Sequence, residues 1–312
     1  MTTFFTPGDN RRFSKLIFRM LSMGILLLLV VLTSNAQGTK TLEIVQNLRT
    51  PSSTNKITVY YSEGYKKKAL ELRSLIEEAM RFYERKLGIK EEFSLAVLTQ
   101  DQWSQVRKSP YGLPWVSGRP HVAFLPATED GVVAADALSF KETVSPATLK
   151  KIKASGYSFE KGAQKFVDLI GLHELGHVYA STYGIRAPNK WLNEMLASYF
   201  AYAFLREKHP KLAMLFYAMA AELVPDNPKQ KYTSLEDFDR LYSGVGVKNY
   251  DWYQGKFFQR VAQVYEVKGL SFLTDVRDAF PQEKQESLTP EAVLHRLERI
   301  STGFLEWSKD LR

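Results

Sequence analysis

The chain has 312 residues, of which 45% are hydrophobic and 24% charged, and this ordinary globular composition excludes collagen, coiled-coil arrays and general disorder. It contains no cysteine, which excludes a disulfide framework, a cysteine nucleophile and a thiolate metal site. The formal net charge is +8, of which residues 1–36 carry +3, and the longest basic run, Lys66-Lys67-Lys68, is typical of a solvated helix face. We therefore expect no nucleic-acid partner, and any metal must be bound by His, Asp or Glu.

Residues 1–36 have the pattern of a secretory signal peptide. Basic residues at 11–19 precede an apolar run at 21–33, and the small residues of Ser34-Asn35-Ala36 allow cleavage before Gln37. The apolar run is shorter than the roughly 20 residues that cross a bilayer. The sequence thus predicts an exported protein, periplasmic or secreted. An uncleaved signal anchor is the alternative, and it would be the one link to a membrane.

The next part of the chain alternates between strand and helix patterns. Residues 37–55 are polar and predict a flexible lead-in. Branched and aromatic residues predict strands at 57–61, 93–98 and 121–125. A helix is predicted at 66–87, where apolar residues recur every three or four positions and Gly88 can end it. Residues 105–120 are rich in Gly and Pro and predict a loop.

From residue 163 onward the patterns are helical. We expect helices near 163–182, 190–208, 211–223, 234–242, 251–268, 271–280 and 290–310. Thr289 can cap the last of these, with Pro290 in its first turn. The order predicts an α+β fold, in which a small N-terminal mixed sheet with helices precedes a mostly helical C-terminal part. One domain over 56–288 and a C-terminal helix over 289–312 follow from it, whereas nothing predicts an oligomeric state.

The segment that carries chemistry is His173-Glu174-Leu175-Gly176-His177, an H-E-x-x-H motif. On a helix, positions i and i+4 share a face, so both imidazoles can reach one metal ion. Glu174 would project beside that pair, close to a water molecule on the metal. The plain alternative is a helix whose histidines are ordinary core or surface residues.

Two histidines leave a catalytic zinc site short of one protein ligand. Glu194 lies in Trp191-Leu192-Asn193-Glu194-Met195-Leu196-Ala197-Ser198, a mostly apolar helical stretch after a short turn. A carboxylate in such surroundings needs a partner, and a metal would be one. The alternative is an ordinary exposed glutamate.

H-E-x-x-H followed by W-L-N-E resembles the gluzincins, the zinc peptidases that include thermolysin and the aminopeptidase N-like enzymes. The seventeen residues from His177 to Glu194 make a slightly shorter spacing than in those two types. The chain is more similar to small bacterial peptidase MA-like domains, with Met195 where those often have Gly and Ala197 where they have Ala. The resemblance covers roughly residues 55–280.

This resemblance implies a zincin-like domain with one Zn²⁺ ion bound by His173, His177 and Glu194. Glu174 is then the general base for the water that attacks a peptide bond in a peptide or protein substrate. The strand at 121–125 would offer its edge to an extended substrate, and the loop at 111–118 would border the cleft.

A donor to the oxyanion is expected as well. Aminopeptidase-like enzymes use a tyrosine about sixty residues after the third ligand, which implies Tyr253, with Tyr250 and Tyr242 as alternatives. Thermolysin-like enzymes use a histidine, for which His209 and His295 are the candidates. The likeness at Tyr253-Gln254-Gly255-Lys256 is partial, because the glycine is displaced by one position. The G-x-M-E-N segment that holds the substrate amino terminus in aminopeptidase-like enzymes is absent from the sequence.

Three functions remain open at this point. The first is an exported zinc peptidase. The second is a non-catalytic zincin-fold protein that serves as a binding or envelope-scaffold protein. The third is a zinc amidase that acts on cell-wall crosslinks.

Overall fold

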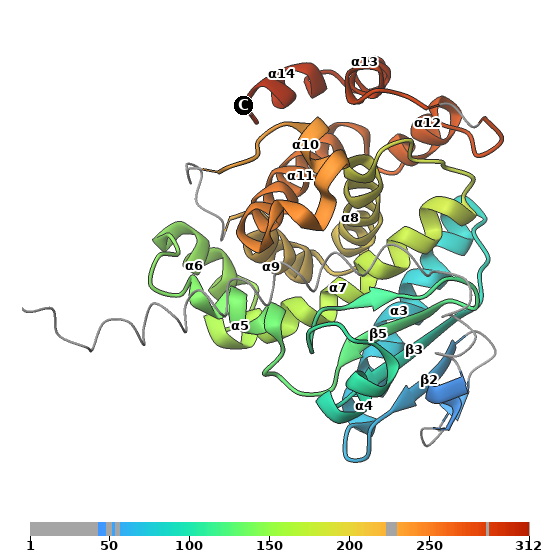
Figure 1. The fold of residues 1–312 in the computed structure, drawn as a ribbon, viewed down its shortest axis with the longest axis vertical. Coiled ribbons are helices and arrows are strands. Elements are labelled where there is room, and N and C mark those ends of the chain that lie inside the picture. Colours follow the sequence, from blue (N-terminus) through green and yellow to red (C-terminus); the bar gives the residue numbers. More distant parts are fainter. Residues whose placement is uncertain (1–42, 48–51, 54–56, 223–229, 285–286, 312) are drawn as a thin grey trace, which may run out of the picture.

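The computed structural model describes residues 43–47, 52–53, 57–222, 230–284 and 287–311 (Figure 1). The signal segment 1–36 lies outside them. The fold is α+β with a small mixed sheet, as the sequence predicts. Within the described ranges, no helix has both the length and the apolar character needed to cross a membrane.

The sheet contains β1 (Ser52–Ser53), β2 (Ile57–Tyr61), β3 (Phe93–Leu98), β4 (Trp115–Val116) and β5 (Val122–Pro126) in the order β1-β2-β3-β5-β4. The central strands β2, β3 and β5 are parallel, and the two short outer strands run antiparallel to their neighbours. The central strands are buried on both faces, which is why they read as nearly continuous apolar runs.

Two of the strands correct the prediction. β5 is an inner strand, so the edge expected at 121–125 is instead supplied by β4, which lies within the predicted loop 105–120. β1 pairs with β2 and lies within the predicted flexible lead-in. Both are two residues long and carry too little pattern to be recognised from sequence.

Helices cover both faces of the sheet. On one face lie α3 (Lys66–Leu87) and α7 (Phe159–Thr182), and on the other lies α4 (Gln100–Val106) (Figure 1). α3 ends at Gly88, whose φ of 71° is left-handed and suits a residue without a side chain. α4, α5 (Val132–Ser139) and α6 (Pro146–Ala154) were not predicted, because helices of seven to nine residues show too little of the 3.6-residue period.

The second half of the chain is helical. Its elements after α7 are α8 (Lys190–Lys208), α9 (Pro210–Ala221), α10 (Leu235–Leu241), the 3-10 helix η2 (Tyr242–Val245), α11 (Val247–Lys268), α12 (Ser271–Ala279), α13 (Pro290–Ile300) and α14 (Phe304–Lys309). The predicted helix at 290–310 is thus two helices, separated at Gly303 with its positive φ of 93°. α8 lies inside this half, packed against α7, α9 and α11.

Candidate metal centre

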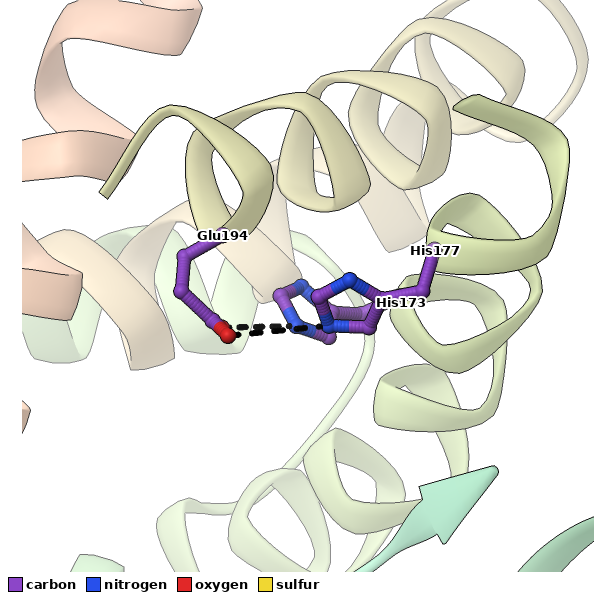
Figure 2. A group of neighbouring side chains, drawn as sticks. All are labelled: His173, His177 and Glu194. Carbon is purple, nitrogen blue, oxygen red and sulfur yellow. Dashed lines mark ion pairs between the residues drawn. The ribbon is translucent and has the colours of Figure 1, made fainter. Parts of the chain in front are cut away.

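The histidines of the H-E-x-x-H motif and the predicted third ligand lie together. α7 presents His173 and His177, and the neighbouring helix α8 presents Glu194, whose carboxylate points toward both imidazoles (Figure 2). Nε2 of His173 lies 3.3 Å from Oε2 of Glu194, and Nε2 of His177 lies 3.8 Å from Oε1. Each residue offers one ligand atom, and all three atoms lie within 4.8 Å of one another.

The far side of each imidazole is held by a polar residue of α8. Nδ1 of His173 lies 3.1 Å from the hydroxyl of Ser198, and Nδ1 of His177 lies 3.1 Å from the side-chain amide of Asn193. The Ser198 hydroxyl can accept from Nδ1–H of His173, which leaves the lone pair of Nε2 for a metal. At His177 the atom facing Nδ1 is the amide nitrogen of Asn193, and turning this amide by 180° would let its oxygen accept from Nδ1–H and free Nε2 in the same way. Ser198 was not predicted, although its i+4 spacing from Glu194 places it on the same helix face.

The Glu194 carboxylate is buried, with 3% of the residue exposed, and it accepts hydrogen bonds from two further side chains. Oε1 accepts from the hydroxyl of Tyr242 at 2.6 Å and Oε2 from the amide of Gln254 at 3.0 Å. Burial by itself would raise the pKa of Glu194. The positive charge of the histidines and the bond from Tyr242 outweigh burial and hold the pKa below its usual value.

Tyr242 adopts an unusual backbone conformation to reach Glu194. Its φ is 51°, and no other non-glycine residue in the described part of the chain has a positive φ. A bulky residue in this region costs about 1–3 kcal/mol and persists where the surrounding structure imposes it. Here the junction of α10 and η2 holds the ring, and the hydroxyl meets the predicted ligand.

Glu174 lies at the free edge of the sheet. The Ser117 N–H donates to Val122 O, so the backbone polar groups of Ser117 face β5. Successive residues of a strand point their backbone polar groups to opposite sides, and the N–H and C=O of Val116 therefore point away from β5. The Val116 N–H lies close enough to the Glu174 carboxylate to act against the rise in its pKa. Glu174 is 8% exposed, and burial, supported by the nearby charge of Glu194, raises its pKa to about 7 against the opposing charges of His177 and Arg107.

The expectation for Tyr253 is corrected. Its side chain is fully buried against Phe238, and its hydroxyl donates to the backbone oxygen of Ser234 at 2.7 Å. On α11 the position facing Glu194 is Gln254, because the neighbouring residue on a helix is turned by about 100°. Of the alternatives, Tyr242 bonds to Glu194, and Tyr250 packs against Tyr242 with ring centroids 5.9 Å apart.

Neither histidine candidate for the oxyanion role joins the cluster. Nε2 of His209 lies 2.8 Å from Oε2 of Glu78, at the junction of α8 and α9. His295 lies on the exposed side of α13 beside Glu291. The cluster therefore has no third imidazole within the parts of the chain that the structure describes.

The donor set fits a zinc ion. Bonds of about 2.0–2.1 Å at tetrahedral angles place ligand atoms roughly 3.3 Å apart. Nε2 of His173 lies at this distance from Oε2, Nε2 of His177 lies 3.8 Å from Oε1, and one ligand atom from each residue lies within 4.8 Å of the others, so small side-chain movements would give the tetrahedral spacing. Two imidazoles and one carboxylate are also the ligand set of several catalytic zinc sites, in which a fourth position stays open. The side chains of both histidines retain some exposure, 14% for His173 and 19% for His177, so solvent can reach the cluster.

Comparison of the chain with models of known protein families, with curated proteins and with solved structures found no match.

Proposed function

We propose that this protein is an exported zinc-dependent peptidase with a zincin-like fold. The observation that carries the proposal is the meeting of His173, His177 and Glu194, with Glu174 buried beside them at the free edge of β4. A structural histidine pair would not require a buried carboxylate that is oriented by two further side chains.

In this proposal, His173, His177 and Glu194 hold the ion, which when bound would supply Lewis acidity and make water acidic enough to attack at neutral pH. Ser198 and Asn193 orient the imidazoles, and Tyr242 and Gln254 orient the carboxylate. Glu174 takes the proton of the attacking water and delivers it to the leaving amine.

The free edge of β4 gives the substrate a place to bind. The Val116 carbonyl points away from β5 and can accept a hydrogen bond from an extended peptide, as in strand addition. Such pairing would hold the scissile bond beside Glu174.

The decisive test is Glu174→Gln in the chain from Gln37 to Arg312. The purified wild type should contain about one zinc ion per chain and cleave members of a peptide library, and chelation should stop cleavage. Glu174→Gln should keep the zinc and lose nearly all hydrolysis, because the base is removed while the ligands stay. Glu160→Gln, an exposed glutamate at the start of the same helix, serves as the control and should have full activity.

Full activity in Glu174→Gln would refute the mechanism. Zinc binding without cleavage of any peptide by the wild type would favour the non-catalytic alternative, or an amide substrate other than a peptide. Export is tested separately by intact-mass measurement, which should find that the exported protein begins at Gln37.

A further inference from the structure

Arg107 is a positively charged residue near the cluster that the proposed mechanism does not use. It follows the last residue of α4, and its guanidinium carbon lies 4.3 Å from the centre of the Trp115 ring. Trp115 in turn stacks on Phe124 of β5, with ring centroids 4.1 Å apart and planes 9° from parallel. The guanidinium therefore lies on a support of two aromatic rings at the sheet edge.

No acidic side chain within the described ranges is paired with this cation. Burial lowers the pKa of Arg107, and Glu174 is the charged group that acts against this effect. Among the described residues, no carboxylate forms a salt bridge or hydrogen bond with the Arg107 side chain. A partly buried guanidinium that stacks through its face keeps its N–H groups free for an incoming acceptor.

The geometry of β4 brings a substrate to this cation. Trp115 and Val116 are consecutive, so their side chains lie on opposite faces of the sheet. Val116 packs on the face that carries α7, and Trp115 packs on the face that carries α4. In a peptide paired with the free edge of β4, successive side chains would alternate in the same way, and those on the Trp115 face would meet Arg107.

We propose that Arg107, supported by Trp115, binds a carboxylate of the substrate and makes this protein selective for peptides that carry a carboxylate on this face. This inference rests on the proposed peptidase function. A planar guanidinium can hold a carboxylate through two parallel hydrogen bonds, which are stronger than bonds between neutral groups. The carboxylate can belong to an Asp or Glu side chain or to the carboxyl terminus of the substrate.

The test compares three libraries of acetylated hexapeptides on the zinc-loaded protein. The first is amidated and contains one Asp or Glu, the second lacks acidic side chains but has a free carboxyl terminus, and the third has neither. We expect kcat/KM for the first or the second library to exceed that for the third by about tenfold or more. One charge-assisted contact is strong enough to give a difference of this size. Whichever library is preferred identifies the source of the carboxylate.

Variants of Arg107 test whether this residue causes the preference for a carboxylate. Arg107→Met should abolish it by slowing only the preferred library, and Arg107→Lys should keep part of it, because a charge remains without the planar pair of donors. Arg119→Met is the matched control, since Arg119 follows β4 as Arg107 precedes it but is exposed and paired with Glu91, and it should keep the full preference. Thermal unfolding of each variant shows whether it is folded.

Two outcomes would overturn the proposal. The first is a wild type that cleaves all three libraries equally. The second is an Arg107→Met variant that slows all three equally, since Arg107 would then act only through the charge of Glu174.

Failure of the peptidase function is recognised separately, by equilibrium dialysis of the same libraries against metal-free protein. The wild type should retain one of the two carboxylate-bearing libraries several-fold more than the library that has no carboxylate, whereas Arg107→Met should retain all three equally. Equal retention by the wild type would refute carboxylate binding, whether or not the protein hydrolyses peptides.

Discussion

Gly176 of α7 lies directly against the backbone of Ala197 in α8. A Cβ at position 176 would come within 2.8 Å of the Ala197 Cα and closer still to its carbonyl oxygen. The two helices approach this closely only because Gly176 has no side chain. The contact lies one residue before His177 and three after Glu194, so it sets the distance between the imidazoles and the carboxylate.

Gly176→Ala should therefore damage both the fold and the metal centre. Inserting a methyl group into a packed interface costs about 1–3 kcal/mol, and here it meets backbone that cannot rotate away. We expect a lower free energy of unfolding in denaturant and weaker zinc binding by titration. Gly162→Ala on the same helix is the control, because its methyl would meet only side chains, Leu215 and Ile152, at 3.1 and 3.2 Å. Equal zinc affinity in the two variants would contradict this account of the centre.

Tyr242→Phe and Tyr253→Phe separate orientation of the ligand from stability of the core. Tyr242→Phe removes the donor to Glu194 and should weaken zinc binding by about 10- to 100-fold, as loss of an outer partner does in other zinc sites. Tyr253→Phe removes a bond to the Ser234 carbonyl and should cost about 0.5–1.5 kcal/mol of stability with zinc affinity unchanged. A loss of zinc affinity in Tyr253→Phe, with Tyr242→Phe unaffected, would reverse the assignment.

Glu194→Gln should remove the response of stability to zinc. A ligand that binds only the native state adds about 2.7 kcal/mol at a concentration one hundred times its dissociation constant. Zinc should thus raise the melting temperature of the wild type, measured by calorimetry, and have much less effect on a variant with two imidazoles and a neutral amide. An equal increase in both proteins would exclude Glu194 as a ligand.

Asp239 predicts a pH dependence of stability. Its Oδ1 accepts from the Trp191 N–H at 3.2 Å at the start of α8, and burial raises its pKa from 3.8 to about 6. The folded protein therefore binds this proton more tightly than the unfolded chain, so the contribution of Asp239 to stability falls between about pH 4 and pH 6.

Asp239→Asn should consequently gain stability relative to the wild type as the pH rises through this interval, and the difference should level off above it. Urea unfolding of both proteins at pH 4, 5, 6 and 7 measures this difference. A difference that does not change with pH would show that Asp239 has its ordinary pKa.

Long periodic elements and local ligand spacing could be predicted from the sequence. The helix at 66–87 matches its predicted bounds, because it is long enough to show its period and ends at Gly88. The strand at 57–61 matches through its branched and aromatic residues, and the helix at 190–208 also matches its predicted bounds. The candidate ligands His173 and His177 lie one helical turn apart, so the helix alone places them on one face. Glu194 could be predicted because a carboxylate is unusual in an apolar helix.

Only the tertiary structure decided which side chains from distant parts of the chain surround the candidate ligands. Tyr242, Gln254 and Arg107 reach the site through the packing of η2 and α11 on α8 and through the pairing of β4 with β5. Tyr253 and Gln254 are adjacent in sequence, yet one faces the core and the other faces Glu194, because a turn of about 100° per residue separates them. Local periodicity therefore determined which residues could bind a metal, and helix packing decided which others surround them, since that depends on contacts that no short segment encodes.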